Sequence, residues 1–447
     1  MKKLFAILLC ICMLLPVLAG CQKEDPATGK VTISYMSWAT GGQKIAEQNA
    51  IKAFNASHSD IYVKATFVPG DYLSRLQTLV AGNKEPDICL LYGNYIHDWA
   101  AKGLLTDLNP YFETAGLDKS DLLDQAQYNS NGGMYGLATG VGTVLVYYNK
   151  QIFADAGITS EMIEGWTWDE YVQILRKVTV DQNGKHPGEE GFNTKKIQTW
   201  GTYVPTASYI NEPLLWSNGG AYFEADGSGL AVDNPESIEV LQKLVDLTYV
   251  ERVAPTAAET AGQSSAVKQM QNGQLASFIS GVYEMASFHA EGWYDYGVAL
   301  LPVFDEQVGQ VWGEPLVIFE SCENKEAAFE FLQYFLDPET NLQLTKDGTQ
   351  MPSFKSWYTD PEKFALWTDN ACHVEEFRKI IPEFVPNCKA TRSHYYIKNA
   401  DAVGSIIWNA LDQSYLNNMP VSKAVSGIEE KAKPYLQGVW DVIPWQD

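Results

Sequence analysis

The sequence predicts an α/β fold in which helices pack on parallel-type sheets. Apolar side chains alternate with a period of two residues over 31–36 and again over 61–67, as in half-buried strands. A stretch with helical spacing separates these two runs, and a second helical stretch leads to an apolar run at 86–91. Parallel strands need crossover connections, so this β-α-β-α-β order favours a parallel sheet with helices packed on it.

Each of these elements has its own signal. The first helix is indicated by Ala46, Ala50 and Phe54, which fall on one helical face. The second helix is predicted over residues 72–80, and Gly82-Asn83 closes it. The run at 86–91 is nearly all apolar after Asp87, which indicates a buried strand.

Further along the chain, helix starts and strands continue to alternate. Thr167 and Glu170 have capping-box spacing before an apolar stripe, and Asn234 followed by Pro235 is a second helix start. Asp337-Pro338-Glu339 predicts a third helix that ends near Gly348. Strands are expected over 296–303 and 316–319.

Length and charge restrict the classes of protein that fit. The chain has 447 residues, which predicts two domains or more, and 46% of them are hydrophobic, which predicts ordered folding. Without Lys2 and Lys3, 30 basic residues stand against 55 acidic ones, a net charge of about −25. Such a chain is repelled by phosphate backbones, so nucleic acid is not an expected partner.

The N-terminus looks like a bacterial lipoprotein signal. Two lysines precede a largely apolar stretch that is too short for a comfortable membrane span, and Leu18-Ala19-Gly20-Cys21 is similar to a lipobox. Residues 1–20 are therefore expected to be a signal peptide and Cys21 the lipidation site, carrying a diacylglyceryl group and an acyl chain such as palmitate. Residues 21–30 would be a polar tether on the extracytoplasmic face of the cell membrane. An ordinary secretion signal with an accidental cysteine is the alternative.

The remaining cysteines and the histidines indicate no metal or cofactor. Cys89, Cys322, Cys372 and Cys388 show no CxxC spacing, so buried thiols are expected, with a Cys372–Cys388 disulfide as the alternative. The six histidines form no spaced cluster, and no HExxH, GxSxG or GxxxxGK[ST] motif occurs.

A series of segments resembles the family 1 extracellular solute-binding proteins of carbohydrate ABC transporters, to which maltose-binding protein is related. The segments, in the order of that family, are Pro86-Asp87-Ile88, Gly103-Leu104-Leu105, Met134-Tyr135-Gly136-Leu137, Val146-Tyr147-Tyr148-Asn149-Lys150, Ala156-Gly157-Ile158, Thr167-Trp168-Asp169-Glu170, Trp216-Ser217-Asn218-Gly219-Gly220, Tyr296-Gly297-Val298, Leu301-Pro302, Asn324-Lys325-Glu326-Ala327-Ala328 and Phe331-Leu332. Each segment is weak alone, but their joint order makes the resemblance specific. It extends from about residue 31 to about residue 436.

This resemblance implies a periplasmic-binding-protein-like fold, with two α/β lobes, hinge strands and a ligand cleft between the lobes. The first lobe would contain residues 31–141 and 303–355, and the second residues 142–302 and 356–447. The crossings would lie near 140–143, near Leu301-Pro302 and around 353–362. The implied function is capture of a mono- or oligosaccharide by closure of the cleft, followed by delivery to the permease of an ABC importer. The chain is expected to act as a monomer and not as an enzyme.

The resemblance places the ligand-binding residues mainly in loops at the carboxyl ends of strands, which is also where open parallel sheets bind ligands. Aromatic rings can stack on sugar faces, and carboxylate or amide groups can bind hydroxyls. The candidates are Trp38, Asp71, Tyr92 and Asn94 in the first lobe and Tyr209, Trp216, Tyr283, Trp312 and Glu314 farther along the chain. At Asn94, relatives often carry a carboxylate. Tyr283 stands where relatives carry a stacking tryptophan.

Several alternatives stay open at this point. The alternative for each aromatic candidate is packing in the core, and the alternative for each acidic candidate is capping a helix or facing solvent. A secreted glycosidase or a scaffold lipoprotein would fit the same N-terminus, although a pair of carboxylates among 55 acidic residues is not a specific signal. The sugar is not identified, and a polyol, an aminosugar or another polar solute is an alternative ligand.

Overall fold

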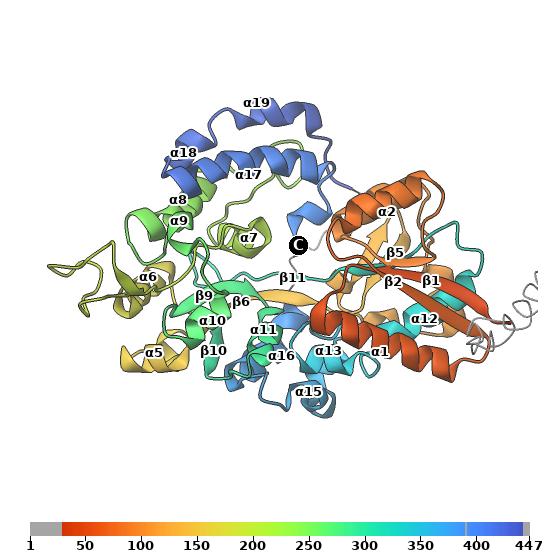
Figure 1. Ribbon diagram of the computed structural model, residues 1–447. Helices are drawn as coiled ribbons and strands as arrows, with labels where there is room; N and C mark the ends of the chain where they lie inside the picture. The colour runs from red at the N-terminus through yellow and green to blue at the C-terminus, as the bar shows by residue number, and fades with distance from the viewer. Residues whose placement is uncertain (1–28, 389–390, 441–447) are drawn as a thin grey trace, which may run out of the picture.

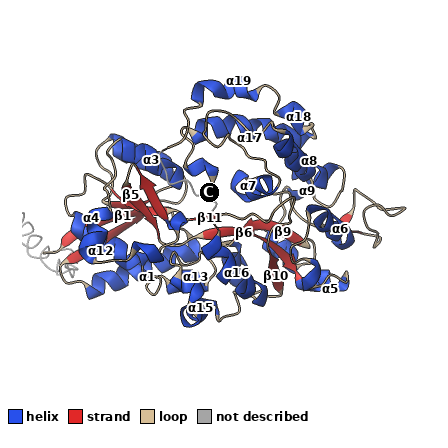
Figure 2. Ribbon diagram, turned by 180° about the vertical axis from the view of Figure 1, so that it is seen from behind, coloured by secondary structure: helices blue, strands red, loops and turns tan. Residues whose placement is uncertain are grey.

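The computed structural model describes residues 29–388 and 391–440, and the predicted signal peptide, Cys21 and most of the tether lie outside them. Two α/β lobes stand side by side, with β11 between them (Figure 1). Figure 2 shows the same arrangement from behind, with α17 and α19 along one edge of the molecule. In the described part of the chain, no helix combines the length and the apolar character that crossing a membrane requires.

The first lobe is built on a six-stranded sheet with the order β2-β1-β3-β12-β5-β4. Its strands are β1 (Val31–Ser37), β2 (Ile61–Phe67), β3 (Ile88–Leu90), β4 (Gln127–Ser130), β5 (Gly133–Ala138) and β12 (Pro315–Ile318). Its helices include α1 (Gly41–Ser57), α2 (Tyr72–Ala81), α3 (Gly93–Ala101), α4 (Asn109–Ala115), α12 (Lys325–Leu336) and α13 (Leu342–Lys346). The predicted parallel pairing is confirmed for β1 with β2 and β3, whereas β12 and β4 pair antiparallel.

The second lobe contains a four-stranded sheet around β6 (Gly142–Asn149). Its partners β9 (Ser277–Gly281), β10 (Tyr296–Ala299) and β11 (Val311–Trp312) all run antiparallel to β6. A separate hairpin-like pair is formed by β7 (Val180–Asp181) and β8 (Ile197–Thr199). The helices of the second lobe include α5 (Lys150–Asp155), α6 (Trp168–Val178), α7 (Ser208–Ser217), α8 (Pro235–Tyr249), α9 (Ala257–Thr260), α10 (Ala266–Gln271) and α11 (Glu284–Ala290).

The C-terminal third of the chain is helical. After β12 and its two helices come α14 (Ser356–Thr359), α15 (Pro361–Thr368), α16 (Glu375–Asn387), α17 (Ala400–Asn417), α18 (Val421–Ala424) and α19 (Ile428–Ala432). Short 3-10 turns are η1 (Lys119–Asp121), η2 (Asp124–Ala126), η3 (Ser160–Met162), η4 (Ser393–Tyr395) and η5 (Lys433–Tyr435). Tyr249 of α8 donates to the carbonyl of Tyr415 at 2.9 Å, which ties α17 to the second lobe.

Local signals explain where several helices begin. The Thr167 hydroxyl accepts from the Glu170 N–H, and the Glu170 carboxylate accepts from the Thr167 N–H at 2.8 Å, so the predicted capping box of α6 is confirmed. Pro235 is the first residue of α8, as predicted. The helix start at Asp337-Pro338-Glu339 was wrong. Asp337 ends α12 and its carboxylate accepts from the Glu339 N–H at 2.9 Å in a turn, so the next helix begins only at Leu342.

The strand predicted over 296–303 is shorter, because β10 ends at Ala299. Beyond it, Val303 exchanges backbone hydrogen bonds of 2.8 Å with Trp166 and Trp168 of the second lobe. Cys372 is a free thiol, so the disulfide considered with Cys388 is not formed.

Three chain segments cross between the lobes and lie against one another. Val141, which joins β5 to β6, exchanges two backbone hydrogen bonds of 2.8 Å with Met351. On the other side, Trp312 of β11 pairs with Gly142. Val303, Val311 and Trp312, which the resemblance implies for the first lobe, thus bond to residues of the second lobe.

Gly313 occupies a close approach of the hinge segments. A Cβ at this position would lie 2.4 Å from the Ala138 Cβ and 2.6 Å from the Gly140 carbonyl oxygen. Only glycine allows the returning chain to pass this closely. The hinge segments are therefore packed against each other and cannot be read as loose linkers.

Candidate functional site

A cavity of about 280 Å³ lies beside the hinge, where Trp38 follows β1 and Tyr283 follows β9. Both lobes line it. The lining residues are Trp38, Gln43, Glu47, Leu90, Thr139, Gly140, Val141, Gly142, Val282, Tyr283, Trp312, Gly313, Glu314, Phe335, Leu344, Thr349 and Gln350. Of the nine predicted site residues, the cavity brings together Trp38, Tyr283, Trp312 and Glu314.

An aromatic platform stands at the first-lobe side of the cavity. The Trp38 ring stacks on Tyr92 with centroids 4.6 Å apart and planes 4° apart, and Tyr72 meets the Trp38 ring edge-on at 5.1 Å. The Tyr72 hydroxyl donates to the Leu90 carbonyl at 2.6 Å, which fixes Tyr72 against β3. Asp71 is exposed and precedes α2 with a left-handed backbone, outside the cavity lining.

The second lobe contributes three of the predicted aromatic residues close together. The hydroxyls of Tyr209 and Tyr283 are hydrogen-bonded at 2.9 Å, and the Tyr209 ring meets Trp312 at 5.8 Å between centroids. Tyr283 is 37% exposed, whereas Trp312 is only 8% exposed because it lies in the hinge strand β11. Tyr283 therefore offers the more accessible ring.

Trp216 lies apart from these rings. It is half-buried on α7, seven residues after Tyr209, so both side chains share one face of the helix two turns apart. Trp216 does not line the 280 Å³ cavity.

Glu314 is held at the boundary between the lobes. Its carboxylate accepts from the Gly93 N–H at 2.9 Å and from the Tyr395 hydroxyl at 2.9 Å, and Arg392 lies 3.4 Å away. Burial raises the pKa of the Glu314 carboxyl, and the charge of Arg392 acts in the opposite direction. Glu314 thus joins α3 of the first lobe to the C-terminal segment.

Sequence reasoning missed Arg392. Its guanidinium lies over the rings of both Tyr209 and Tyr395, 4.9 Å from each centroid, in addition to its contact with Glu314. The residues around Tyr395, which also contacts Glu314, show no helical or strand periodicity. No local signal indicates that this stretch crosses the space between the lobes, since its contacts are with residues far away in the chain.

The same C-terminal segment also contacts the second lobe through Glu212 of α7. Both the hydroxyl and the N–H of Ser393 donate to the Glu212 carboxylate. Burial raises the pKa of Glu212 from 4.5 to about 7. Glu212 is therefore a buried acid that bonds to neutral donors at the lobe boundary.

Asn94 contacts the C-terminal helix in this structure. Its amide donates to both oxygens of Asp401 at 3.1 Å, and Asp401 also accepts from the Tyr95 hydroxyl at 2.7 Å. His394 lies 2.7 Å from the same carboxylate, and these hydrogen bonds lower the pKa of Asp401. Asn94 is not among the cavity residues.

A second residue missed by the sequence analysis is Glu47. It is 2% exposed, lines the cavity, and accepts from the Tyr35 hydroxyl at 3.0 Å and from the Gln43 amide at 3.1 Å. A signal existed, because Glu47 shares the apolar face of α1 with the predicted core positions Ala50 and Phe54. A charged residue at a core position is uncommon.

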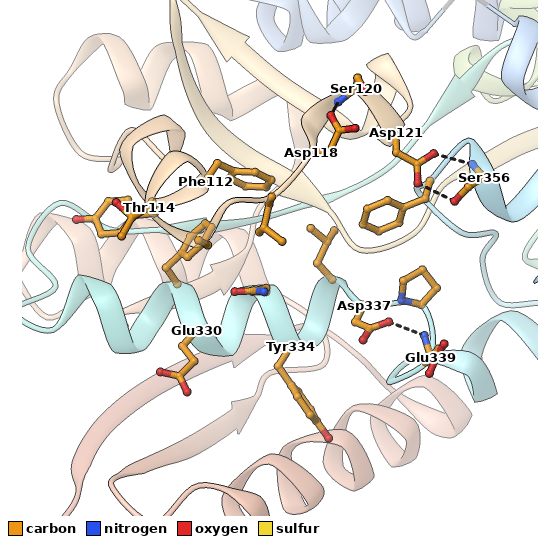
Figure 3. A pocket seen from close by; sticks show the side chains of 18 of the residues that line it. Phe112, Thr114, Asp118, Ser120, Asp121, Glu330, Tyr334, Asp337, Glu339 and Ser356 are labelled. Atoms are coloured by element: carbon orange, nitrogen blue, oxygen red, sulfur yellow. Dashed lines mark hydrogen bonds between the residues drawn. The ribbon is translucent and has the colours of Figure 1, made fainter.

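A wider hollow of about 1470 Å³ lies on the first lobe, between α4 and α12, away from the predicted residues (Figure 3). Two of its labelled carboxylates, those of Asp118 and Asp121, accept hydrogen bonds from neighbouring residues. Asp121 accepts from the Ser356 N–H at 2.8 Å and from its hydroxyl at 2.6 Å, and Asp118 accepts from the Ser120 N–H at 2.8 Å. None of the nine predicted site residues lines this hollow. In the described residues, no group of three His, Cys, Asp or Glu side chains is placed to hold a metal ion.

Comparisons with known proteins agree with this architecture. The model of the family "Bacterial extracellular solute-binding protein" matches residues 38–342. An arabinooligosaccharide-binding protein of Halalkalibacterium halodurans is 28% identical over 72% of this chain and 71% of its own length. A maltooligosaccharide ABC transporter solute-binding lipoprotein of Streptococcus pneumoniae is 24% identical over 65% of this chain and 66% of its own. Among solved structures, an ABC substrate-binding protein of Listeria monocytogenes in complex with cycloalternan superimposes with a TM-score of 0.77 at 23% identity, covering 91% of this chain and 98% of the other.

Proposed function

Because this chain belongs to the bacterial extracellular solute-binding proteins, we propose that it captures a carbohydrate in the cavity beside the hinge and delivers it to the permease of an ABC importer. The single observation that carries this proposal is the cavity itself. Trp38 from one lobe and Tyr283 and Trp312 from the other surround the same space, with Glu314 at its edge. The names of the two relatives given above favour an oligosaccharide.

Closure of the two lobes on the sugar is part of this proposal. A ligand shifts the population toward a closed form only by its extra affinity for that form. Here Gly140, Val141, Gly142 and Gly313 of the hinge belong to the cavity lining, so the bound sugar would contact the segments whose backbone must rotate. Micromolar affinity corresponds to about −8 kcal/mol, and one ring covering roughly 50 Å² supplies about 1 kcal/mol, so several contacts must act together.

A sugar panel tests capture and closure with the lipid-free chain. At ten times its Kd, a bound sugar should raise the free energy of unfolding by about 1.4 kcal/mol. Small-angle scattering should show a smaller radius of gyration and the mass of a monomer. The sugar should be recovered unchanged, and cells that lack this chain should lose its uptake. Product formation would instead support an enzyme, and indifference to every sugar would contradict capture.

We propose further that Cys21 anchors the chain to the extracytoplasmic face of the membrane. The support is the lipobox-like sequence Leu18-Ala19-Gly20-Cys21 together with the lipoprotein relative in Streptococcus pneumoniae. Two or three acyl chains hold a protein at a membrane almost permanently. Cys21→Ser should abolish incorporation of labelled palmitate and release the protein into the medium or periplasm. Cys322→Ser is the matched control, and unchanged labelling of Cys21→Ser would refute the anchor.

A further inference from the structure

One cavity residue lacks the partner that its chemistry requires. Glu47 is 2% exposed, and the hydrogen bonds to its carboxylate come from the neutral groups of Ser37, Tyr35 and Gln43. Within the described residues it forms no ion pair, and no cationic group contributes to its electrostatic surroundings. Buried charges in proteins are ordinarily paired with a charge of opposite sign, because burial of an unpaired one is costly.

The position of Glu47 on α1 makes the missing countercharge more significant. Ala50, Ile51 and Phe54 on the same helical face are buried core residues, so an apolar side chain would fit the fold at position 47. Burial raises the pKa of Glu47 from 4.5 to about 7, which means that the carboxyl titrates near neutral pH in the ligand-free protein. A carboxylate that breaks the local apolar pattern without a compensating positive charge is expected at a functional site.

The rest of the cavity lining also favours a positively charged ligand. It contains two carboxylates, Glu47 and Glu314, and no lysine, arginine or histidine. The charge of Glu314 is already met by Arg392, whereas that of Glu47 is not. Trp38, Tyr283 and Trp312 line the same cavity, and aromatic rings attract cations to their faces.

We propose that the ligand of this cavity is a sugar that carries a protonated amino group, with Glu47 as its countercharge and Trp38 as the neighbouring ring. This inference rests on the proposed function and names the class of carbohydrate that the same site takes. A bound ammonium group would complete the ion pair that the ligand-free protein lacks. A neutral sugar would leave Glu47 as it is.

The test compares matched sugars on the wild type and on Glu47→Gln. The panel contains glucosamine, galactosamine, mannosamine and β-1,4-linked oligomers of glucosamine. Each amino sugar is compared with its N-acetylated counterpart and with the neutral sugar that carries a hydroxyl group in place of the amine. We expect the best amino sugar to bind at least tenfold more tightly than both counterparts. Glu47→Gln should lose at least tenfold in affinity for it and less than twofold for the hydroxyl sugar. Glu190→Gln, which removes a charge from an exposed loop, should change neither.

Calorimetry in two buffers of different ionisation enthalpy gives a second readout. At pH 6 the amino sugar should release close to one proton per site, because the cation drives Glu47 to ionise. The titratable group that contacts Glu47 is Tyr35 of β1, and Cys89 of β3 lies near Tyr35. Burial raises the pKa of Tyr35 well above its ordinary value and that of Cys89 to about 12, so neither group releases a proton at pH 6. Glu314, across the cavity, is held by Gly93, Tyr395 and Arg392.

The outcomes separate this inference from the proposed function. A neutral sugar that binds best, without proton release and equally well to Glu47→Gln, would overturn the amino-sugar inference and leave sugar capture standing. No binding by any sugar of the panel to a folded wild type would overturn the inference and count against sugar capture as well. A melting temperature of Glu47→Gln at or above that of the wild type verifies that lost affinity is not lost folding.

Discussion

The stability of Glu212→Gln relative to the wild type should increase by about 3 kcal/mol as the pH is raised from 4.5 to 7. The pKa of Glu212 is raised to about 7 in the folded protein by burial, whereas the unfolded chain has the ordinary value of 4.5. Below pH 4.5 both states hold the proton, so the wild type loses nothing. Between pH 4.5 and 7 only the unfolded state ionises, so wild-type stability falls by about 1.4 kcal/mol per pH unit and then stays level. Glutamine cannot ionise and avoids this loss.

The measurement is urea unfolding of the ligand-free wild type and of the variant at several pH values from 4.5 to 8. Glutamine keeps the size of Glu212 and an oxygen to accept from Ser393, so the variant should fold. Glu190→Gln on its exposed loop serves as the control and should show no gain that depends on pH. Parallel pH profiles for Glu212→Gln and the wild type would mean that Glu212 is ionised at the lobe boundary.

Trp38→Ala should weaken sugar binding by about 2 kcal/mol, which is roughly thirtyfold. The Trp38 ring lines the cavity and is held flat against Tyr92, so its loss removes a preformed stacking face from the first lobe. Titration calorimetry with a sugar that binds the wild type measures the effect. Trp38→Phe keeps an aromatic face and should retain most of the affinity.

Trp293→Ala is the matched control for this prediction. Trp293 packs on Phe288 with centroids 5.7 Å apart and is not among the cavity residues, so its loss should lower stability and leave affinity unchanged. If Trp38→Ala bound the sugar as tightly as the wild type, the Trp38 platform would belong to the core alone.

Local patterns were enough to predict the elements whose signals are local. Alternation over 31–36 and the capping box at Thr167 correspond to β1 and α6. The signal at Asp337-Pro338-Glu339 failed because the same residue types also end a helix and form a turn. The expected strand over 296–303 was too long, because Val303 bonds to the residues beside Thr167, more than a hundred positions earlier in the chain.

The residues of the site differ in the same way, because some have a local signal in the sequence and others come together only in the folded chain. Trp38 lines the cavity and follows the strand that the local alternation over 31–36 predicts, whereas Tyr283 was singled out only by the resemblance to the family. Arg392 reaches Glu314 only because the folded chain returns between the lobes, and no neighbouring residue announces this. Glu47 could have been recognised from its place on the apolar face of α1. Its role depends on what it faces, which a helical pattern does not contain.

The return of residues 391–401 between the lobes has a consequence for protein engineering. The family match ends at residue 342, yet Arg392, Tyr395 and Asp401 bond to Glu314 and Asn94 well upstream. This stretch therefore ties the chain beyond the family match to both lobes, through Glu314 on one side and Glu212 on the other. A chimera that keeps only the family-matched part of this chain would lose these contacts, so residues 391–401 have to be transferred together with the lobes that they join.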